Sequence, residues 1–136
     1  MDERTVTKKE AARRQITAAI EHYEKGEYEC AITLAGAAEG QLTTKDDDNH
    51  LFNELRVRRP PEFKNEKEWV DELNAAQHWL KHATPHLGDE WVFDDFGAGT
   101  MILRAITKFH WTYRQISQRM INFKDQWRKS QSPKLN

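Results

Sequence analysis

The sequence predicts an all-α protein, an antiparallel bundle of about four to five helices. Apolar residues recur every three or four positions in several segments, which is the spacing of one face of an α-helix. No stretch alternates apolar and polar residues for long enough to indicate a β-strand. Short connections between the predicted helices favour antiparallel neighbours. We expect a single helical domain over residues 1–136, because a chain of this length can bury one core.

Composition and charge narrow the functional classes. The formal net charge is −1, so nucleic acid is not the default partner. The single cysteine, Cys30, cannot form an intramolecular disulfide and fits a reducing compartment, and Glu27 and Glu29 beside it argue mildly against a reactive thiolate. The charged N-terminal residues lack the apolar run of a signal peptide, and no stretch approaches the ~20 apolar residues of a membrane span. We therefore expect a cytoplasmic protein with no membrane partner and no cofactor.

The first two helices are expected to form an αα-hairpin. Thr7 and Glu10 have the spacing of a capping box, so the first helix should begin near Thr7 and stop at Gly26. The second helix is expected over residues 27–43, and its many alanines and glycines would let another helix approach closely. Residues 19–39 also resemble one tetratricopeptide unit. Because no second copy follows after about 34 residues, the likeness indicates only a local hairpin.

Three more helical segments are predicted downstream, over residues 51–56, 66–83 and 96–117. Asn65 is the expected cap of the middle segment, with Glu68 three residues on. The polar end of the chain, residues 118–136, is expected to be an extended or frayed tail. In the last helix Arg104 should be exposed and His110 should lie in the helical packing. They point about 120° apart, so one chain could not easily use both in one site.

Three histidines raise the alternative of a metal site. His78 and His82 lie four residues apart on one face of the 66–83 helix, and such a pair can bind one metal ion, with His86 as a third ligand from the loop. Neither an HExxH motif nor a cysteine pair accompanies them, and His86 leaves the helical register after Pro85. Ordinary polar histidines at a helix end are therefore the leading interpretation, and a metal-binding bundle is the weaker alternative.

The segment NAAQHWLKHA, residues 74–83, carries a family resemblance. It is similar to a group of uncharacterised bacterial proteins that read N-x-x-[KR]-N-[FW]-[FL]-K-H-A at this place, and the likeness spans about residues 27–113. That group in turn resembles the HEPN superfamily of helical bundles. In HEPN ribonucleases an arginine and a following histidine from each of two protomers meet across a dimer interface and cut RNA without metal. The resemblance thus implies a HEPN-like bundle, a homodimer and an RNA or protein partner.

Carried over residue by residue, the HEPN histidine falls on His82, the arginine position on Gln77, and the Asn or Asp position after it on His78. Gln77 is a departure, because a guanidinium there would normally stabilise the charge of the transition state. His82 could still act as a general acid or base, and Lys81 could supply the missing charge. If the motif serves structure, Asn74 should bond to the loop after His82 and fix the helix end.

Two further functional interpretations follow. The first is an RNA-related or defence/toxin–antitoxin module whose ribonuclease motif is degenerate. For this module we favour a non-catalytic role. The second is an interaction or scaffold bundle that holds a partner with exposed aromatic side chains, for which Trp91, Trp111 and Trp127 are the candidates. His82 beside a self-association surface would favour the first interpretation. An exposed apolar patch elsewhere would favour the second.

Overall fold

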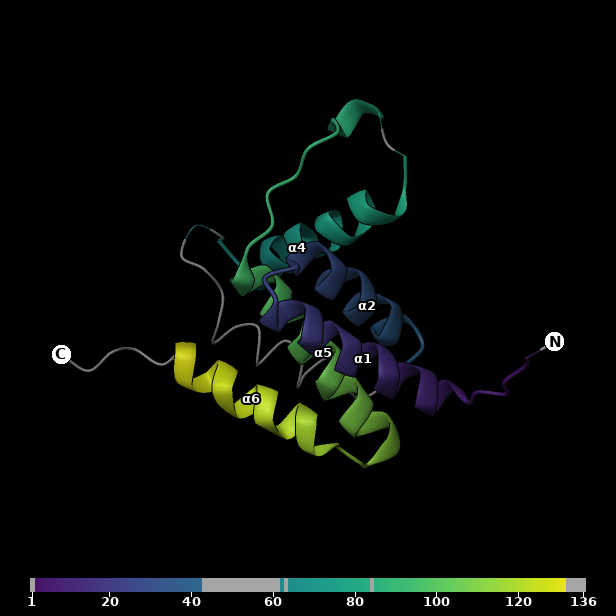
Figure 1. Cartoon of the computed structure of the whole chain (residues 1–136). Helices are drawn as coiled ribbons and strands as arrows, with labels where there is room; N and C mark the ends of the chain where they lie inside the picture. The colour runs from purple at the N-terminus through teal and green to yellow at the C-terminus, as the bar shows by residue number, and fades with distance from the viewer. Residues whose placement is uncertain (1, 43–61, 63, 84, 132–136) are drawn as a thin grey trace.

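The computed structural model describes residues 2–42, 62, 64–83 and 85–131, and this part of the chain is all-helical without a strand. The elements are α1 (Lys8–Glu24), α2 (Tyr28–Gly40), α4 (Glu66–Lys81), the 3-10 helix η1 (Pro85–Leu87), α5 (Asp95–Tyr113) and α6 (Gln118–Gln131) (Figure 1). The predicted all-α class is confirmed. The helix expected over residues 51–56 lies outside the described residues.

None of the helices in the described part of the chain combines the length and the apolar character that crossing a membrane requires.

The α1–α2 hairpin begins and turns where the sequence predicts. The Thr7 hydroxyl accepts a hydrogen bond from the backbone N–H of Glu10 at 3.1 Å, which caps the first turn of α1. Gly26 follows α1 with a φ of +75°, a left-handed conformation that glycine adopts without strain, and the chain enters α2 two residues later. The second helix is shorter than expected, because its cap is Gln41 and Leu42 lies beyond it.

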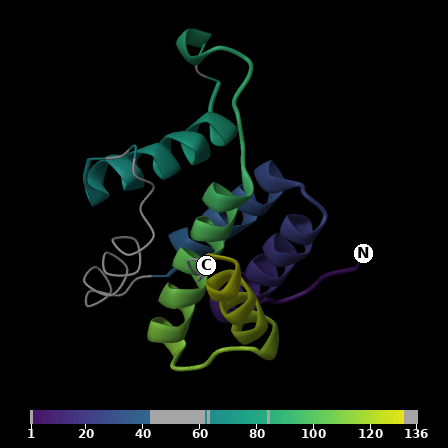
Figure 2. The ribbon, with the colours of Figure 1, turned by 90° about the vertical axis from the view of Figure 1, so that its left-hand side faces the viewer.

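Helix α5 is the centre of the bundle. It packs against α1, α2 and α6, and Figure 2 shows it as the green helix beside α6. Every residue of α5 from Ala98 to Thr107 is buried, which is why this helix reads as apolar over most of its circumference. The bulkiest fully buried side chains come from α1, α5 and α6: Ile16, Ile20, Met101, Ile102, Ile106, Phe109 and Met120.

The C-terminal segment corrects the expectation of a frayed tail. The long helix ends at Tyr113, where Arg114 takes a left-handed φ of 54°, and a separate helix, α6, follows. Helix α6 packs on α1 and α5 and buries Met120, Phe123 and Trp127. Gly99 of α5 makes room for the indole, because a Cβ added there would lie 2.5 Å from Trp127 Cη2. The charged residues between these apolar positions hid a helical period in the sequence.

Helix α4 projects from the other helices and leads into a loop that returns to α5 (Figures 1 and 2). The Asn65 side chain accepts from the backbone N–H of Glu68 at 2.9 Å, so the predicted cap is confirmed. The helix ends at Lys81, two residues earlier than expected, and His82 is its extended C-cap. We call residues 85–94, which comprise η1 and the segment that joins it to α5, the arch.

Candidate functional site

Gln77, at the motif's arginine position, packs against α2. A Cβ added at Gly36 would lie 2.5 Å from Gln77 Cδ, so glycine is what lets this side chain approach the α2 backbone. The close approach of another helix, predicted from the alanines and glycines of the second helix, therefore occurs at Gly36. Gln77 is half-buried between two helices as a neutral amide, and it contributes no positive charge to any site.

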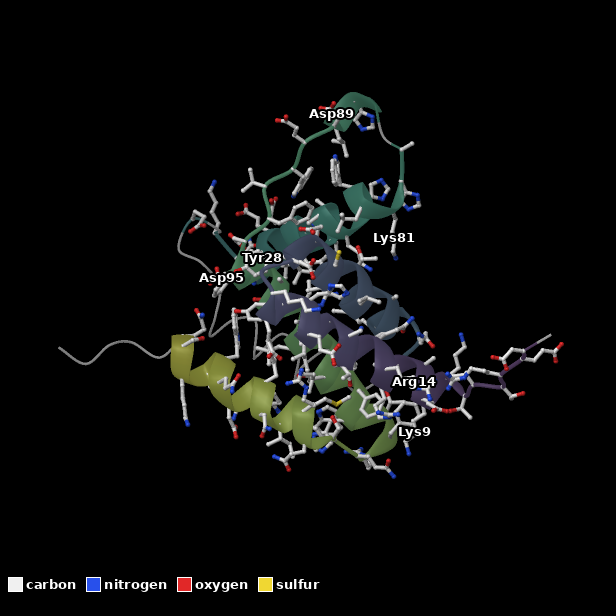
Figure 3. The ribbon with its side chains drawn as sticks, in the orientation of Figure 1. Lys9, Arg14, Tyr28, Lys81, Asp89 and Asp95 are labelled. Atoms are coloured by element: carbon white, nitrogen blue, oxygen red, sulfur yellow. The ribbon has the colours of Figure 1, made fainter. Side chains whose placement is uncertain are left out.

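His82 stands at the exposed end of α4. Its backbone N–H donates to the carbonyl of His78 at 3.0 Å, and the two imidazole rings lie 4.5 Å apart between centroids. Both histidines and Lys81 are exposed, and Figure 3 shows Lys81 at this helix end. The structure thus brings together three of the five motif residues, whereas Gln77 and Asn74 make their contacts with other helices.

The three-histidine metal site is not formed in the described part of the chain. No group of three or more histidine, cysteine, aspartate or glutamate side chains there is placed to hold a metal ion. His86 belongs to η1, beyond the end of α4, and does not complete the pair of His78 and His82. The proline before it breaks the helical register that would have aligned all three rings.

A buried ionic network corrects the expectations for Arg104 and Asn74, and the burial pattern of α5 corrects the one for His110. Arg104, expected to be exposed, is buried and donates to the Glu39 carboxylate at 2.6 Å. Lys108 donates to the same Glu39 oxygen at 3.0 Å, and Arg104 also donates to the Asn74 side-chain oxygen at 3.1 Å. Asn74 therefore binds α5 rather than the loop after His82, and His110, expected to be packed, is exposed. A buried cation requires such partners, so the network ties α2, α4 and α5 together.

Trp79, rather than Asn74, fastens the loop after His82. Its indole N–H donates to the carbonyl of Gly88 at 3.1 Å. Its ring also lies 6.1 Å from Trp91 and 6.0 Å from Phe93, measured between centroids. These contacts hold the arch against α4. The sequence carried the aromatic residues that make this cluster, but their distance along the chain concealed it.

The candidate partner-binding tryptophans take three different places. Trp127 is 2 % exposed in the α6 interface, so it is not available to a partner, contrary to the expectation. Trp111 is half-buried, with the Arg114 guanidinium 4.4 Å from the ring centroid. Trp91 is half-buried in the arch, beside Val92, which is 92 % exposed. Of the three tryptophans, only Trp91 lies beside a strongly exposed apolar side chain, that of Val92.

Two hollows flank the arch. A groove of about 290 Å³ lies between α4, the arch and the start of α5, with Trp69, Leu73 and Phe96 among its apolar lining residues. A broader, shallow hollow of about 800 Å³ is lined by Trp79 of α4 and by residues of the arch, among them Leu87. Trp91 and Val92 line both hollows. No lysine, arginine or histidine is among the described residues that line the two hollows. The lining carboxylates are Glu62, Glu72, Asp89, Glu90 and Asp94.

No family model, curated protein or solved structure matches this chain. The similarity to HEPN bundles and the homodimer therefore stay predictions from the sequence.

Proposed function

We propose that the protein is a non-enzymatic interaction module that holds a protein partner on the surface formed by the arch and α4. One observation carries the proposal. The described residues contain three exposed large apolar side chains, and two of them, Leu87 and Val92, lie on the arch. Both line the same hollow as the half-buried Trp91. Clustered apolar exposure of this kind is typical of protein–protein interaction sites.

The arrangement of the motif residues supports a role without RNA cleavage. In the HEPN motif a guanidinium at position 77 would stabilise the developing phosphorane-like charge. Here the cation that accompanies His82 at the helix end is Lys81. Gln77 is neutral and packs against α2, and Arg104 is held by Glu39 and Asn74 within the bundle. As a proposal on lineage, a HEPN-like ancestor that lost its arginine at position 77 is consistent with this arrangement.

Site-specific photo-cross-linking tests the interaction. A photo-reactive amino acid is placed at Val92 and, as a matched control, at Val6, which is 42 % exposed at the opposite end of the sequence. In cells of the source organism we expect a discrete protein adduct from position 92 and none from position 6. The same adducts from both positions, or none from either, would contradict the proposal.

RNA cleavage is assayed on the purified protein. We expect RNA to stay intact with the wild-type protein and with His82→Ala, with and without EDTA. Cleavage by the wild-type protein that is lost in His82→Ala would show an enzyme and overturn the proposed function.

A further inference from the structure

We infer that the partner presents a cationic, amphipathic peptide segment, which places apolar side chains in the groove between α4 and the arch and lysine or arginine side chains against its carboxylates. This inference rests on the proposed function and specifies the ligand of that same surface. It is carried by three properties of the groove: its size, its charge and its continuity over the arch.

The size of the groove suits side chains of a peptide. Its volume of about 290 Å³ lies at the lower limit of the roughly 300–1,000 Å³ of small-molecule and cofactor pockets. The apolar lining is partly preformed, because Trp69 and Leu73 are buried in α4 and the Phe96 ring lies 5.4 Å from the Trp69 ring. One or two apolar side chains of a partner would fill this space and exclude water from it.

The charge around the groove selects for cations. Glu62, Glu72 and Asp94 line it, and all three are exposed. Asp94 also caps α5, accepting from the Gly97 N–H at 2.7 Å, so its position is held. No lysine, arginine or histidine is among the described lining residues to neutralise these carboxylates. An approaching basic segment would gain from them, and an acidic segment would be repelled.

The arch extends the same chemistry. Asp89 and Glu90 line the shallow hollow, and Figure 3 shows Asp89 near the tip of the arch. Since Trp91 and Val92 line both hollows, a segment seated in the groove can continue over the arch and cover the exposed valine. Lysine or arginine side chains at intervals along the segment would then meet the carboxylates of both hollows.

Helix α6 of a second copy of this chain is not the occupant. Helix α6 carries Arg128 and Lys129 at its end, but its apolar residues Met120, Phe123 and Trp127 are buried in its own bundle. Its other large apolar residue, Ile121, is half-buried, so α6 offers no exposed large apolar side chain to the groove. A separate partner that offers both apolar and basic side chains fits the surface better.

Fluorescence anisotropy with three labelled synthetic peptides tests this inference. One peptide carries leucine at helical spacing with lysine elsewhere, the second replaces lysine by glutamate, and the third replaces leucine by serine. We expect the lysine–leucine peptide to bind at least about tenfold more tightly than either of the others. We also expect its binding to weaken as salt rises from about 0.05 M to about 0.5 M, because the exposed carboxylates become screened.

Matched variants locate the binding site. Glu72→Lys and Val92→Ser should each weaken binding of the lysine–leucine peptide by about tenfold or more. Glu21→Lys makes the same charge change on α1, which lines neither hollow, and should alter binding less than about threefold. Circular dichroism confirms that each variant is folded, and the milder Glu72→Gln, with an intermediate loss expected, replaces any variant that is not.

Each outcome decides the inference. Equal binding of the glutamate–leucine peptide, equal binding of the lysine–serine peptide, or an equal loss in Glu21→Lys and Glu72→Lys would overturn it. If no peptide binds while position 92 still cross-links to a protein, the partner's chemistry is wrong but the proposed function stands. If position 92 also yields no adduct, both fail.

Discussion

The buried carboxylate of Glu39 is the group whose loss should destabilise the bundle most clearly. Its side chain is 9 % exposed and contacts both Arg104 and Lys108. Glu39→Leu would leave the equally buried Arg104 guanidinium without its anion, and breaking a buried pair in this way costs about 3–5 kcal/mol. Lys108 is 21 % exposed, so it can turn toward water. The expected loss therefore comes mainly from Arg104.

Replacing the cation instead should cost less. In Arg104→Met the Glu39 carboxylate keeps Lys108, whose Nζ lies 3.0 Å from Oε1. We expect this variant to lose about 2 kcal/mol of unfolding free energy, within the range for hydrogen bonds to charged groups. The double variant Glu39→Leu/Arg104→Met removes both buried charges. Its loss of unfolding free energy should be smaller than the sum of the two single losses by about 2 kcal/mol, because residues in direct contact couple.

Urea unfolding followed by circular dichroism measures these losses. The control is Asp71→Ala, which breaks the Lys67–Asp71 pair, whose side chains are 83 % and 61 % exposed, and should cost less than about 1 kcal/mol. If Glu39→Leu costs no more than this control, or if the two single losses simply add in the double variant, the argument that pairing makes the buried arginine tolerable is refuted.

Three further predictions concern α6, a tyrosine and the cysteine. Gly99→Ala should lower the unfolding free energy by about 1–3 kcal/mol, because the rigid Trp127 ring obstructs the new Cβ; Gly40→Ala, where a Cβ meets nothing within 4 Å, should raise it by up to about 1 kcal/mol. Urea unfolding compares the two, and equal effects would contradict the proposed packing. Burial, with a contribution from the Asp95 charge, raises the pKa of Tyr23 from 10.0 to about 12. The folded state thus holds this proton more tightly than the unfolded state, so stability should be retained below pH 10 and fall as the pH rises toward 12. Tyr23→Phe should flatten that part of the stability–pH profile, and an unchanged profile would refute the assignment. Burial, with smaller contributions from neighbouring glutamates, also raises the pKa of the Cys30 thiol. Its alkylation at neutral pH should therefore be slower in the folded protein than in the urea-unfolded chain, and equal rates would contradict this.

The candidate site was only partly predictable, because its parts depend on contacts between distant residues. Trp91 was identified as a binding candidate from its residue type, and it lies on the arch. Its link to Trp79, which holds the arch in place, was missed. Leu87 and Val92 were also missed, since a single leucine or valine in a loop looks unremarkable until the fold shows that neighbouring elements leave it uncovered.

The helical class and the local signals at helix ends can be read from the order of the amino acids alone. Thr7, Gly26 and Asn65 act within three residues of their own positions, so their roles could be read directly from the chain. The burial of Arg104 could not be read in this way, because its anion, Glu39, lies 65 positions away and meets it only in the packed bundle. The same holds for α6: its apolar residues form a core only where α1 and α5 provide the opposing surface. Local capping depends on neighbours along the chain, whereas burial depends on which surfaces meet in space.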